Sequence, residues 1–175
     1  YTADFLTIGV GARPLAMGGA FAAVANDVSA FSWNPAGLVQ SKRVSLHIEH
    51  VPMFGGLAQY NTANAILSLN ENMAIGLSWI RLGIDEIPRY SVLQGTRLDR
   101  MTKGQYRSTG QPEGYFADTE DAFLVSFGQT LYFDLYFGGL SGNIVPLELS
   151  YGITGKYIHQ KLDSFLGTGQ GLDAG

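Results

Sequence analysis

Apolar and polar residues alternate along five separate runs of this chain between residues 43 and 162. In the first run, RVSLHIEH (43–50), Val44, Leu46 and Ile48 fall on one side of an extended strand and the polar residues fall on the other. A short Asn-Glu-Asn segment at 70–72 joins two of the runs and is typical of a hairpin turn. This repeated period of two predicts an all-β protein with an antiparallel sheet, whose strands cover 43–50, 58–70, 73–82, 121–131 and 147–162.

Two β architectures fit this pattern. Each run has an apolar face and a face of small or polar residues; Phe123 and Val125, for example, alternate with Ala122 and Ser126. Such faces suit the wall of a membrane barrel, and they equally suit a soluble β-sandwich with one core face and one wet face. A bacterial barrel closes with at least about eight strands. Since a sixth run only begins at 171–175, the barrel interpretation expects the chain to be the N-terminal part of a longer one.

The composition narrows the class of protein. Charged residues make up 15% of the chain, against about 25% in ordinary soluble domains, and 23 of the 175 residues are glycine. Aromatic residues make up 12%, which together with the low charge suits a β-rich protein whose faces meet different surroundings. The net charge of −4, without a basic stripe, disfavours nucleic acid as a partner. The lack of cysteine excludes disulfides and cysteine-based metal sites or nucleophiles.

The connections between the strands differ in length. The turn at 70–72 is tight, the segment at 51–57 is short to moderate, the segment at 84–120 is long, and the one at 132–146 is moderate. Outer-membrane barrels have short periplasmic turns and longer extracellular loops. The barrel interpretation therefore places the tight turn in the periplasm and the long loop outside the cell. It also places the segment at 132–146 in the periplasm, and this segment is longer than a periplasmic turn is expected to be. The long loop carries candidate contacts for anionic lipopolysaccharide or cargo, although an ordinary solvated loop is the alternative: Arg89, Arg97, Arg100, Lys103 and Arg107.

Residues 1–42 lack the alternation and are expected to be helical or irregular. Asp27 or Ser29 is placed to cap a short helix through Phe31 and Trp33. The following Asn34-Pro35 step should end that helix, because the proline ring disfavours the α conformation of the residue before it. We expect Gly37 to let the backbone turn beyond this point.

The motifs of catalytic and cofactor-binding proteins are missing from the sequence. The glycine-rich start is no dinucleotide-binding loop, because that motif would need glycine where Pro14 stands, and no Gly-x-Ser-x-Gly occurs. His47 and Glu49 share a strand face while His50 faces the other way, which predicts a polar pair rather than a metal site. The acids at 118–121 are expected to be solvated. We therefore expect a non-enzymatic protein without catalytic residues, metal or cofactor.

The N-terminal segment carries a dense set of motifs that resembles a known family. In order, these are Phe5-Leu6, the IGVGAR segment at 8–13, the MGGAF segment at 17–21, Asp27, and WNPAGL at 33–38. Together they resemble the opening of the PorV/PorQ branch of the FadL-type outer-membrane proteins. The segments at 73–88 and 152–175 also resemble strands of that family, whereas the long loop at 85–120 and the segment at 132–148 depart from it.

The resemblance implies a fold and a location. It implies an antiparallel transmembrane β-barrel in the bacterial outer membrane, with 14 strands when complete and an N-terminal helical plug inside. Residues 1–42 would form the plug, or hatch, and residues 43–175 the first strands of the barrel. The plug motif would consist of Gly9, Gly11, Arg13, Met17, Gly18, Gly19, Asp27, Trp33, Asn34, Pro35, Ala36 and Gly37.

The resemblance also implies a choice of functions. One is a carrier or adaptor in the type IX secretion system, whose partners are secretion-system proteins and the C-terminal signal domains of exported cargo. The alternative is a FadL-like transporter of long-chain fatty acids or other hydrophobic solutes, with a hydrophobic small molecule in the lumen. In both cases the barrel would contact outer-membrane lipid and lipopolysaccharide. A soluble β-sandwich binding module is the third hypothesis.

Overall fold

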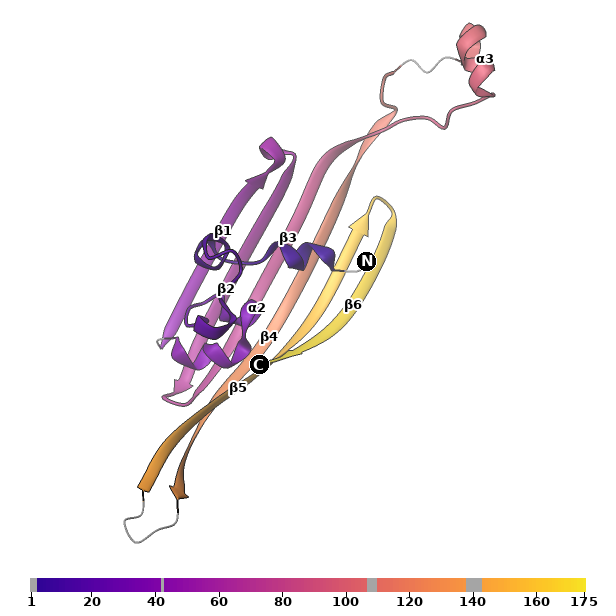
Figure 1. The fold of residues 1–175 in the computed structure, drawn as a ribbon. Coiled ribbons are helices and arrows are strands. Elements are labelled where there is room, and N and C mark those ends of the chain that lie inside the picture. Colours follow the sequence, from indigo (N-terminus) through magenta and orange to yellow (C-terminus); the bar gives the residue numbers. More distant parts are fainter. Residues whose placement is uncertain (1–2, 42, 107–109, 138–142) are drawn as a thin grey trace.

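The computed structural model describes residues 3–41, 43–106, 110–137 and 143–175. Its main feature is a single sheet of six antiparallel strands that follow one another in chain order (Figure 1). In the part of the chain that is described, β1 pairs only with β2 and β6 pairs only with β5. The strands are β1 (Val44–Met53), β2 (Ala58–Asn70), β3 (Met73–Arg89), β4 (Gly114–Phe137), β5 (Asn143–Leu162) and β6 (Phe165–Ala174).

The hairpin of β2 and β3 agrees with the sequence-based prediction, but the long loop does not. β3 runs on to Arg89 and β4 begins at Gly114, so the prediction of a loop over 85–120 is wrong at both ends. The two extensions pair with each other across a bulge between Ile84 and Ile87, where Glu86 has a φ of 57°. Backbone pairing therefore carries this hairpin through a polar sequence, and the helices α3 (Arg97–Thr102) and η5 (Gly104–Tyr106) lie in its connection.

The predicted connection at 132–146 is also mostly strand. The register of β4 and β5 continues without interruption from Gln129 opposite Tyr151 to Phe137 opposite Asn143. This hairpin extends well past the tight turn between β2 and β3 (Figure 1). β6 likewise begins at Phe165, earlier than the start predicted at 171.

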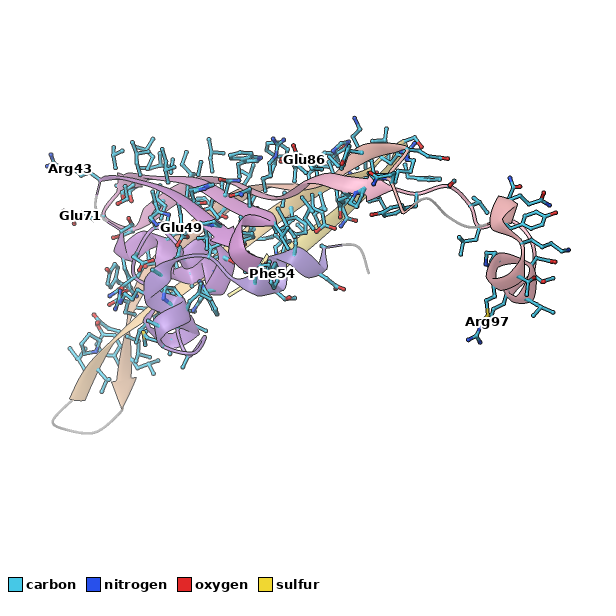
Figure 2. All side chains as sticks on the ribbon, turned by 90° about the horizontal axis from the view of Figure 1, so that it is seen from above. Arg43, Glu49, Phe54, Glu71, Glu86 and Arg97 are labelled. Carbon is cyan, nitrogen blue, oxygen red and sulfur yellow. The ribbon has the colours of Figure 1, made fainter. Side chains whose placement is uncertain are left out.

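Residues 3–41 form a chain of short helices that packs against one face of the sheet (Figure 2). This agrees with the expectation of a helical or irregular segment. We call the covered face of the sheet the inner face and the opposite one the outer face. The helices are η1 (Asp4–Ile8), α1 (Ala12–Ala16), η2 (Ala22–Val24), α2 (Ala30–Trp33) and η3 (Pro35–Gln40), and a further short turn, η4 (Phe54–Gly56), joins β1 to β2.

The buried core lies between these helices and the inner face. Phe21, Phe31 and Leu38 from the N-terminal segment are fully buried there, together with Ile66 of β2 and Ile80 of β3. Burying each such side chain stabilises the arrangement by about 1.5–3 kcal/mol. In the described residues, the sheet buries apolar side chains on its inner face and not on its outer face. The N-terminal segment, which packs on the inner face, therefore supplies much of the hydrophobic core.

The outer face leaves its apolar side chains in the open. Ile48 is 85% exposed and Leu46 is 76% exposed, and the strands β2 to β6 continue this surface. The alternation read from the sequence is thus confirmed, with most of the larger apolar residues of the strands on the outer face. The exposed set comprises Val44, Leu46, Ile48, Leu67, Leu69, Ile75, Leu77, Phe123, Val125, Ile153, Tyr157 and Leu172.

Candidate functional site

The WNPAGL segment forms the turn that fixes the N-terminal segment to the sheet. α2 ends at Trp33, and Asn34 is extended with a φ of −161°, as the following proline requires. The side-chain oxygen of Asn34 accepts a hydrogen bond of 3.1 Å from the backbone N–H of Ala36 and so caps η3. The Asn34 amide nitrogen donates to the carbonyl of Ala22 at 2.9 Å. One side chain thereby starts η3 and also ties it to the preceding segment.

Gly37 is required here for a reason different from the predicted one. Its φ lies outside the left-handed region, so it makes no turn that other residues would avoid. Instead, a Cβ atom at position 37 would lie 1.7 Å from the carbonyl oxygen of Ala25. The glycine therefore permits a close approach of two backbone segments within the N-terminal unit.

Trp33 holds together the first part of the N-terminal segment. Its ring nitrogen donates to the carbonyl of Val10 at 2.9 Å, and its ring meets the edge of Phe21 with 6.2 Å between centroids. Gly9 and Gly19 both have positive φ and face the same ring, where a Cβ atom would lie 3.0 Å and 3.5 Å from it, respectively. These two glycines thus serve the packing of the tryptophan.

A polar cluster beside the tryptophan joins the early part of the N-terminal segment to its middle part. Arg13 donates to the side-chain oxygen of Asn26 at 2.7 Å, lies 3.5 Å from the carboxylate of Asp27 and stacks over the ring of Phe21. Asp27 in turn accepts from the backbone N–H and the hydroxyl of Ser29, directly before α2. Ser29 is the N-cap residue of α2, but no side chain caps the helix, so the predicted cap by Asp27 or Ser29 is not formed; Asp27 instead holds the turn that leads into α2.

The remaining predicted plug residues lie in different surroundings. Gly11 has a φ of 93°, and its N–H donates to the Glu49 carboxylate of β1 at 3.2 Å. Pro35 and Ala36 are buried against the sheet. Met17 is 42% exposed, and a Cβ atom on Gly18 would meet nothing within 4 Å. The structure therefore brings together most of the predicted motif but leaves Met17 and Gly18 at its surface.

Two glycines of the inner face form the seat on which η3 rests. Gly128 of β4 and Gly152 of β5 lie directly opposite each other. A Cβ atom on Gly152 would lie 2.3 Å from the carbonyl carbon of Pro35, and one on Gly128 would lie 3.0 Å from the oxygen of the same carbonyl. Leu38 packs beside them and is fully buried. We call Gly128 and Gly152 the glycine seat; the signal for it in the sequence is a pair of glycines on the small-residue face of two strands.

Hydroxyl and carboxylate groups connect the N-terminal segment to the sheet around this seat. The Thr154 hydroxyl donates to the carbonyl of Phe31 at 3.4 Å and shares a hydrogen bond of 2.8 Å with Ser126. His47 and Glu49 face inward, as predicted, and His47 contacts Asn64 at 3.3 Å. Within the described residues, no group of three or more metal-ligating side chains of the His, Asp or Glu type is present.

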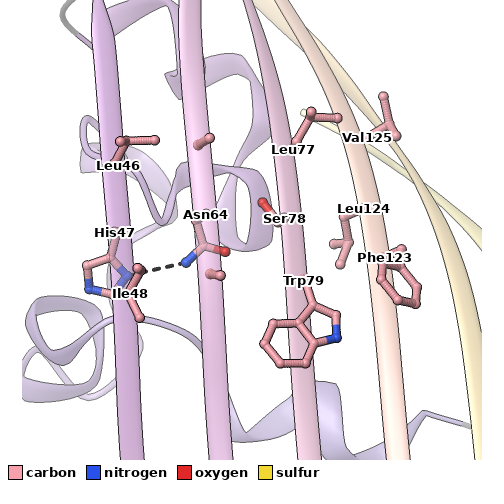
Figure 3. Close-up of a pocket in the computed structure, with 12 residues that line it drawn as sticks. Leu46, His47, Ile48, Asn64, Leu77, Ser78, Trp79, Phe123, Leu124 and Val125 are labelled. Carbon is pink, nitrogen blue, oxygen red and sulfur yellow. Dashed lines mark hydrogen bonds between the residues drawn. The ribbon is translucent and has the colours of Figure 1, made fainter.

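A shallow apolar depression of about 530 Å³ lies on the outer face (Figure 3). Leu46 and Ile48 of β1 stand on one side of it and Leu77 and Trp79 of β3 on the other. Its floor on β2 consists of the small residues Ala63 and Ala65. Since apolar side chains line it, the depression suits hydrocarbon chains rather than a polar ligand.

A row of polar residues crosses the outer face above the apolar side chains. In register from β1 to β5 it comprises His50, Asn61, Arg81, Asp121 and His159, which we call the border row. His50 and Asn61 share a hydrogen bond of 2.7 Å. The border row interrupts the apolar surface on the side of the long β3–β4 connection, and beyond it Tyr115 and Leu166 are again exposed.

Asp121 is the best-buried member of the border row, with 8% of its side chain exposed. Arg81 binds it through two nitrogens, at 2.7 Å and 2.9 Å, and the ring nitrogen of Trp79 donates to it at 2.8 Å. The Arg81 guanidinium also lies over the Trp79 ring. These contacts supply hydrogen bonds and a positive charge to a carboxylate that lies beside apolar surface. The prediction that Asp121 is merely solvated is therefore wrong.

The basic residues of the β3–β4 hairpin lie in separate environments. Arg89 pairs with Asp163 in the turn between β5 and β6, and Arg100 donates to the carbonyl of Gly95 at 2.6 Å. Among the described residues, the Arg97 side chain has no ion pair or hydrogen bond, and Arg107 lies outside them. The five predicted loop contacts therefore do not form one cluster.

The helix α3 is capped at its start and is stabilised by an ion pair between nearby residues. Lys103 contacts the carboxylate of Asp99 at 2.8 Å, and Thr96 and Asp99 form reciprocal hydrogen bonds at the start of the helix. The hydrogen bonds from Lys103 and then from Thr96 lower the pKa of Asp99 to about 2. Lys103 is thus engaged inside the loop, and Arg97 is the exposed cation on this helix.

Comparison of the chain with protein-family models, curated proteins and solved structures gave no match. Among the helices in the described ranges, none has the length and apolar character needed to cross a membrane.

Proposed function

We propose that this chain forms part of an outer-membrane β-barrel of the FadL and PorV kind, with residues 1–42 as its plug. The observation that carries the proposal is the contrast between the two faces of the sheet. The outer face exposes large apolar side chains on all six strands, whereas the inner face combines small and polar residues with a few large apolar ones, such as Ile66 and Ile80, that are buried under the N-terminal segment. A membrane barrel needs this arrangement, because lipid contacts one face and a lumen the other.

The extent of the exposed apolar surface favours this proposal over a soluble sandwich. In a sandwich, the apolar face of a sheet is buried against a second layer. Here the described chain provides a layer only on the inner face, and the outer face remains open (Figure 2). Soluble monomers rarely expose contiguous apolar surface larger than a few hundred Å². Lipid is the partner whose chemistry matches this face.

The dimensions of the strands agree with a bilayer. A tilted strand of about 9–11 residues crosses the hydrocarbon region, and β2 has 13 residues while β4 has 24. Trp79 and Tyr157 lie next to the border row, where interfacial aromatic residues of barrels gather. The tight turn at 71–72 would then lie in the periplasm and the β3–β4 connection outside the cell.

Within this class, we propose a non-enzymatic carrier or adaptor for proteins exported by the type IX secretion system. Besides the resemblance of the N-terminal segment, the support is the long β3–β4 hairpin, which holds an ordered helix with the exposed cation Arg97 far from the apolar surface (Figure 2). A hairpin of this kind provides a site for contact with another protein on the outer side.

Two measurements on the full-length protein test these proposals in turn. The barrel proposal expects the protein in the outer-membrane fraction, with extraction only by detergent; recovery in the soluble fraction would contradict it. The adaptor proposal expects capture of exported proteins through their C-terminal domains, and this capture should fall when Arg97 is replaced by glutamate. Equal capture by the R97E variant would remove the proposed role of α3.

A second candidate function is the transport of hydrophobic solutes. The N-terminal segment exposes Leu15, Met17 and Val24, which would offer an apolar surface inside a barrel. Transport predicts a fatty acid or similar molecule in the purified full-length protein, detectable by mass spectrometry after solvent extraction. A lumen free of such a molecule, together with stable cargo capture, would favour the adaptor.

A further inference from the structure

The lower part of β4 has a free edge. β3 begins at Met73, opposite Gln129, and the last contact across this edge is the hydrogen bond of 2.8 Å from the Thr130 N–H to the carbonyl of Asn72. From Leu131 to Phe137, β4 pairs with β5 alone. The tight turn of the chain itself ends β3 at this level, so β3 cannot cover the edge.

The geometry identifies which backbone groups are unpaired. Since the Thr130 N–H points toward β3, the even-numbered residues of β4 direct their N–H and C=O groups to this edge. Tyr132, Asp134 and Tyr136 therefore present a row of donors and acceptors without a partner strand in the described structure. All three residues are exposed, Tyr136 by 72%. Such a row is a template for another strand.

The other edge of the same hairpin, formed by β5, differs from the β4 edge because it carries a proline that hinders the pairing of a further strand. Even-numbered residues of β5 face away from β4, as the hydrogen bonds between Gly152 and Gly175 show. Pro146 occupies one of these outward positions and lacks an N–H, which is a usual device against unwanted strand pairing. The β4 edge from Leu131 to Phe137 contains no proline and only one charged residue, Asp134.

We propose that the free edge of β4 between Leu131 and Phe137 binds an extended segment of a partner protein as an added β-strand. The edge lies beyond the tight turn, so under the proposed outer-membrane function, on which this placement rests, the partner reaches it from the periplasm. The backbone groups supply the binding chemistry, and the side chains define the partner's sequence.

The alternation of β4 predicts the chemistry of the partner strand. Leu131, Phe133 and Leu135 continue the apolar outer face, so apolar residues are expected at the neighbouring positions of the added strand. On the inner face, Asp134 favours lysine or arginine opposite it. A symmetric pairing with a second copy centred on Asp134 would place two carboxylates against each other, which disfavours self-association.

Hydrogen exchange of the backbone amides tests the proposal directly. The full-length protein is compared in its native cell fraction and after purification as a monomer in detergent. The amides of Tyr132, Asp134 and Tyr136 should exchange at least roughly tenfold more slowly in the native fraction, while those of Leu131 and Phe133, which point to β5, should be slow in both.

A matched pair of proline variants separates an added strand from burial in lipid. Asp134→Pro removes an N–H from the free edge of β4, and Glu148→Pro removes an N–H from the outward edge of β5. Neither N–H takes part in the pairing of β4 with β5, so both variants should keep the hairpin. Only Asp134→Pro should abolish the protection at Tyr132 and Tyr136. Equal protection in both variants would point to lipid and overturn the proposal.

The other outcomes are also decisive. Fast exchange of the three amides in the native fraction would show that no strand binds, and slow exchange in the purified monomer would show that the chain covers its own edge. Protection that rises with the concentration of purified protein would identify a second copy instead. The cell fraction that holds the protein tests the membrane proposal separately, because the exchange comparison is made in whichever fraction contains it.

Discussion

Replacing Gly152 by alanine should loosen the N-terminal segment from the sheet. The new Cβ atom would lie 2.3 Å from the carbonyl carbon of Pro35 and 2.5 Å from its oxygen. Carbon atoms in good contact are about 3.5–4.0 Å apart, so η3 must move by more than roughly 1 Å. Overpacking of this kind typically costs about 1–3 kcal/mol. Both atoms belong to the backbone, so a rotamer change cannot relieve the clash.

The matching control lies three residues further along the same strand. At Gly155, on the outer face, a Cβ atom would have its nearest neighbours at 3.9 Å, which is an ordinary contact. Gly155→Ala therefore changes the same strand with the same substitution but leaves the N-terminal segment in place. The difference between the two variants isolates the contact with Pro35.

Labelling of a single cysteine measures the loosening. The chain contains no cysteine, so Ser126→Cys introduces one thiol on the inner face, at a site that is 1% exposed under the N-terminal segment. A cost of about 2 kcal/mol raises the opened fraction, and with it the rate of maleimide labelling, by about 30-fold in the Gly152→Ala protein. The Gly155→Ala protein should label at the rate of the parent. Equal rates in both variants would refute the role of the glycine seat.

Three further predictions concern single interactions. Trp33→Phe keeps the aromatic packing but removes the hydrogen bond to Val10, so the free energy of unfolding should fall by about 1 kcal/mol; an unchanged denaturation midpoint would contradict this. Arg81→Met leaves the buried Asp121 carboxylate without its cation and should lower the free energy of unfolding by about 1–2 kcal/mol, measured in detergent; a gain in stability would show that the pair is not needed. The pKa of Asp99 is lowered to about 2 in the folded chain, so its contribution to stability is complete above pH 3.8 and is lost as the pH falls towards 2. An NMR titration of this carboxyl group should show a midpoint near 2, and a midpoint near 3.8 would contradict the contacts of α3.

The predictability of the strands depended on how clearly their two faces differ. β2 was predicted with its observed bounds, Ala58–Asn70, although its alternation is less clean than that of the other runs, because the tight turn marks where it ends. The lower part of β4 was not recognised, since Leu131–Phe137 is apolar or aromatic at nearly every position and shows no period of two. Its upper part mixes polar and aromatic residues on both faces, without a clear period of two. These extensions form because each strand pairs with its neighbour, which a local pattern cannot reveal.

The site shows the same division between local and long-range information. The end of α2 at Trp33 followed from the Asn34-Pro35 step alone, since proline acts on the residue before it. The glycine seat could not be located in this way. Gly128 and Gly152 face each other only because of the register between β4 and β5, and their contact with Pro35 joins residues more than 90 positions apart. Likewise, the binding of Asp121 by Arg81 depends on the pairing of β3 and β4.

Spin labelling in lipid tests the central claim, that the outer face of the sheet contacts the membrane. Single cysteines at Leu77 and Val125, on the outer face, are compared with cysteines at the inner-face neighbours Ser78 and Ser126. With the full-length protein in liposomes, labels at Leu77 and Val125 should collide frequently with oxygen, which dissolves in lipid, and rarely with a water-soluble nickel chelate. The inner-face labels should not show this preference. If the nickel chelate reached Leu77 and Val125 as readily as a label at the exposed Leu98, the outer face would lie in water and the membrane proposal would be wrong.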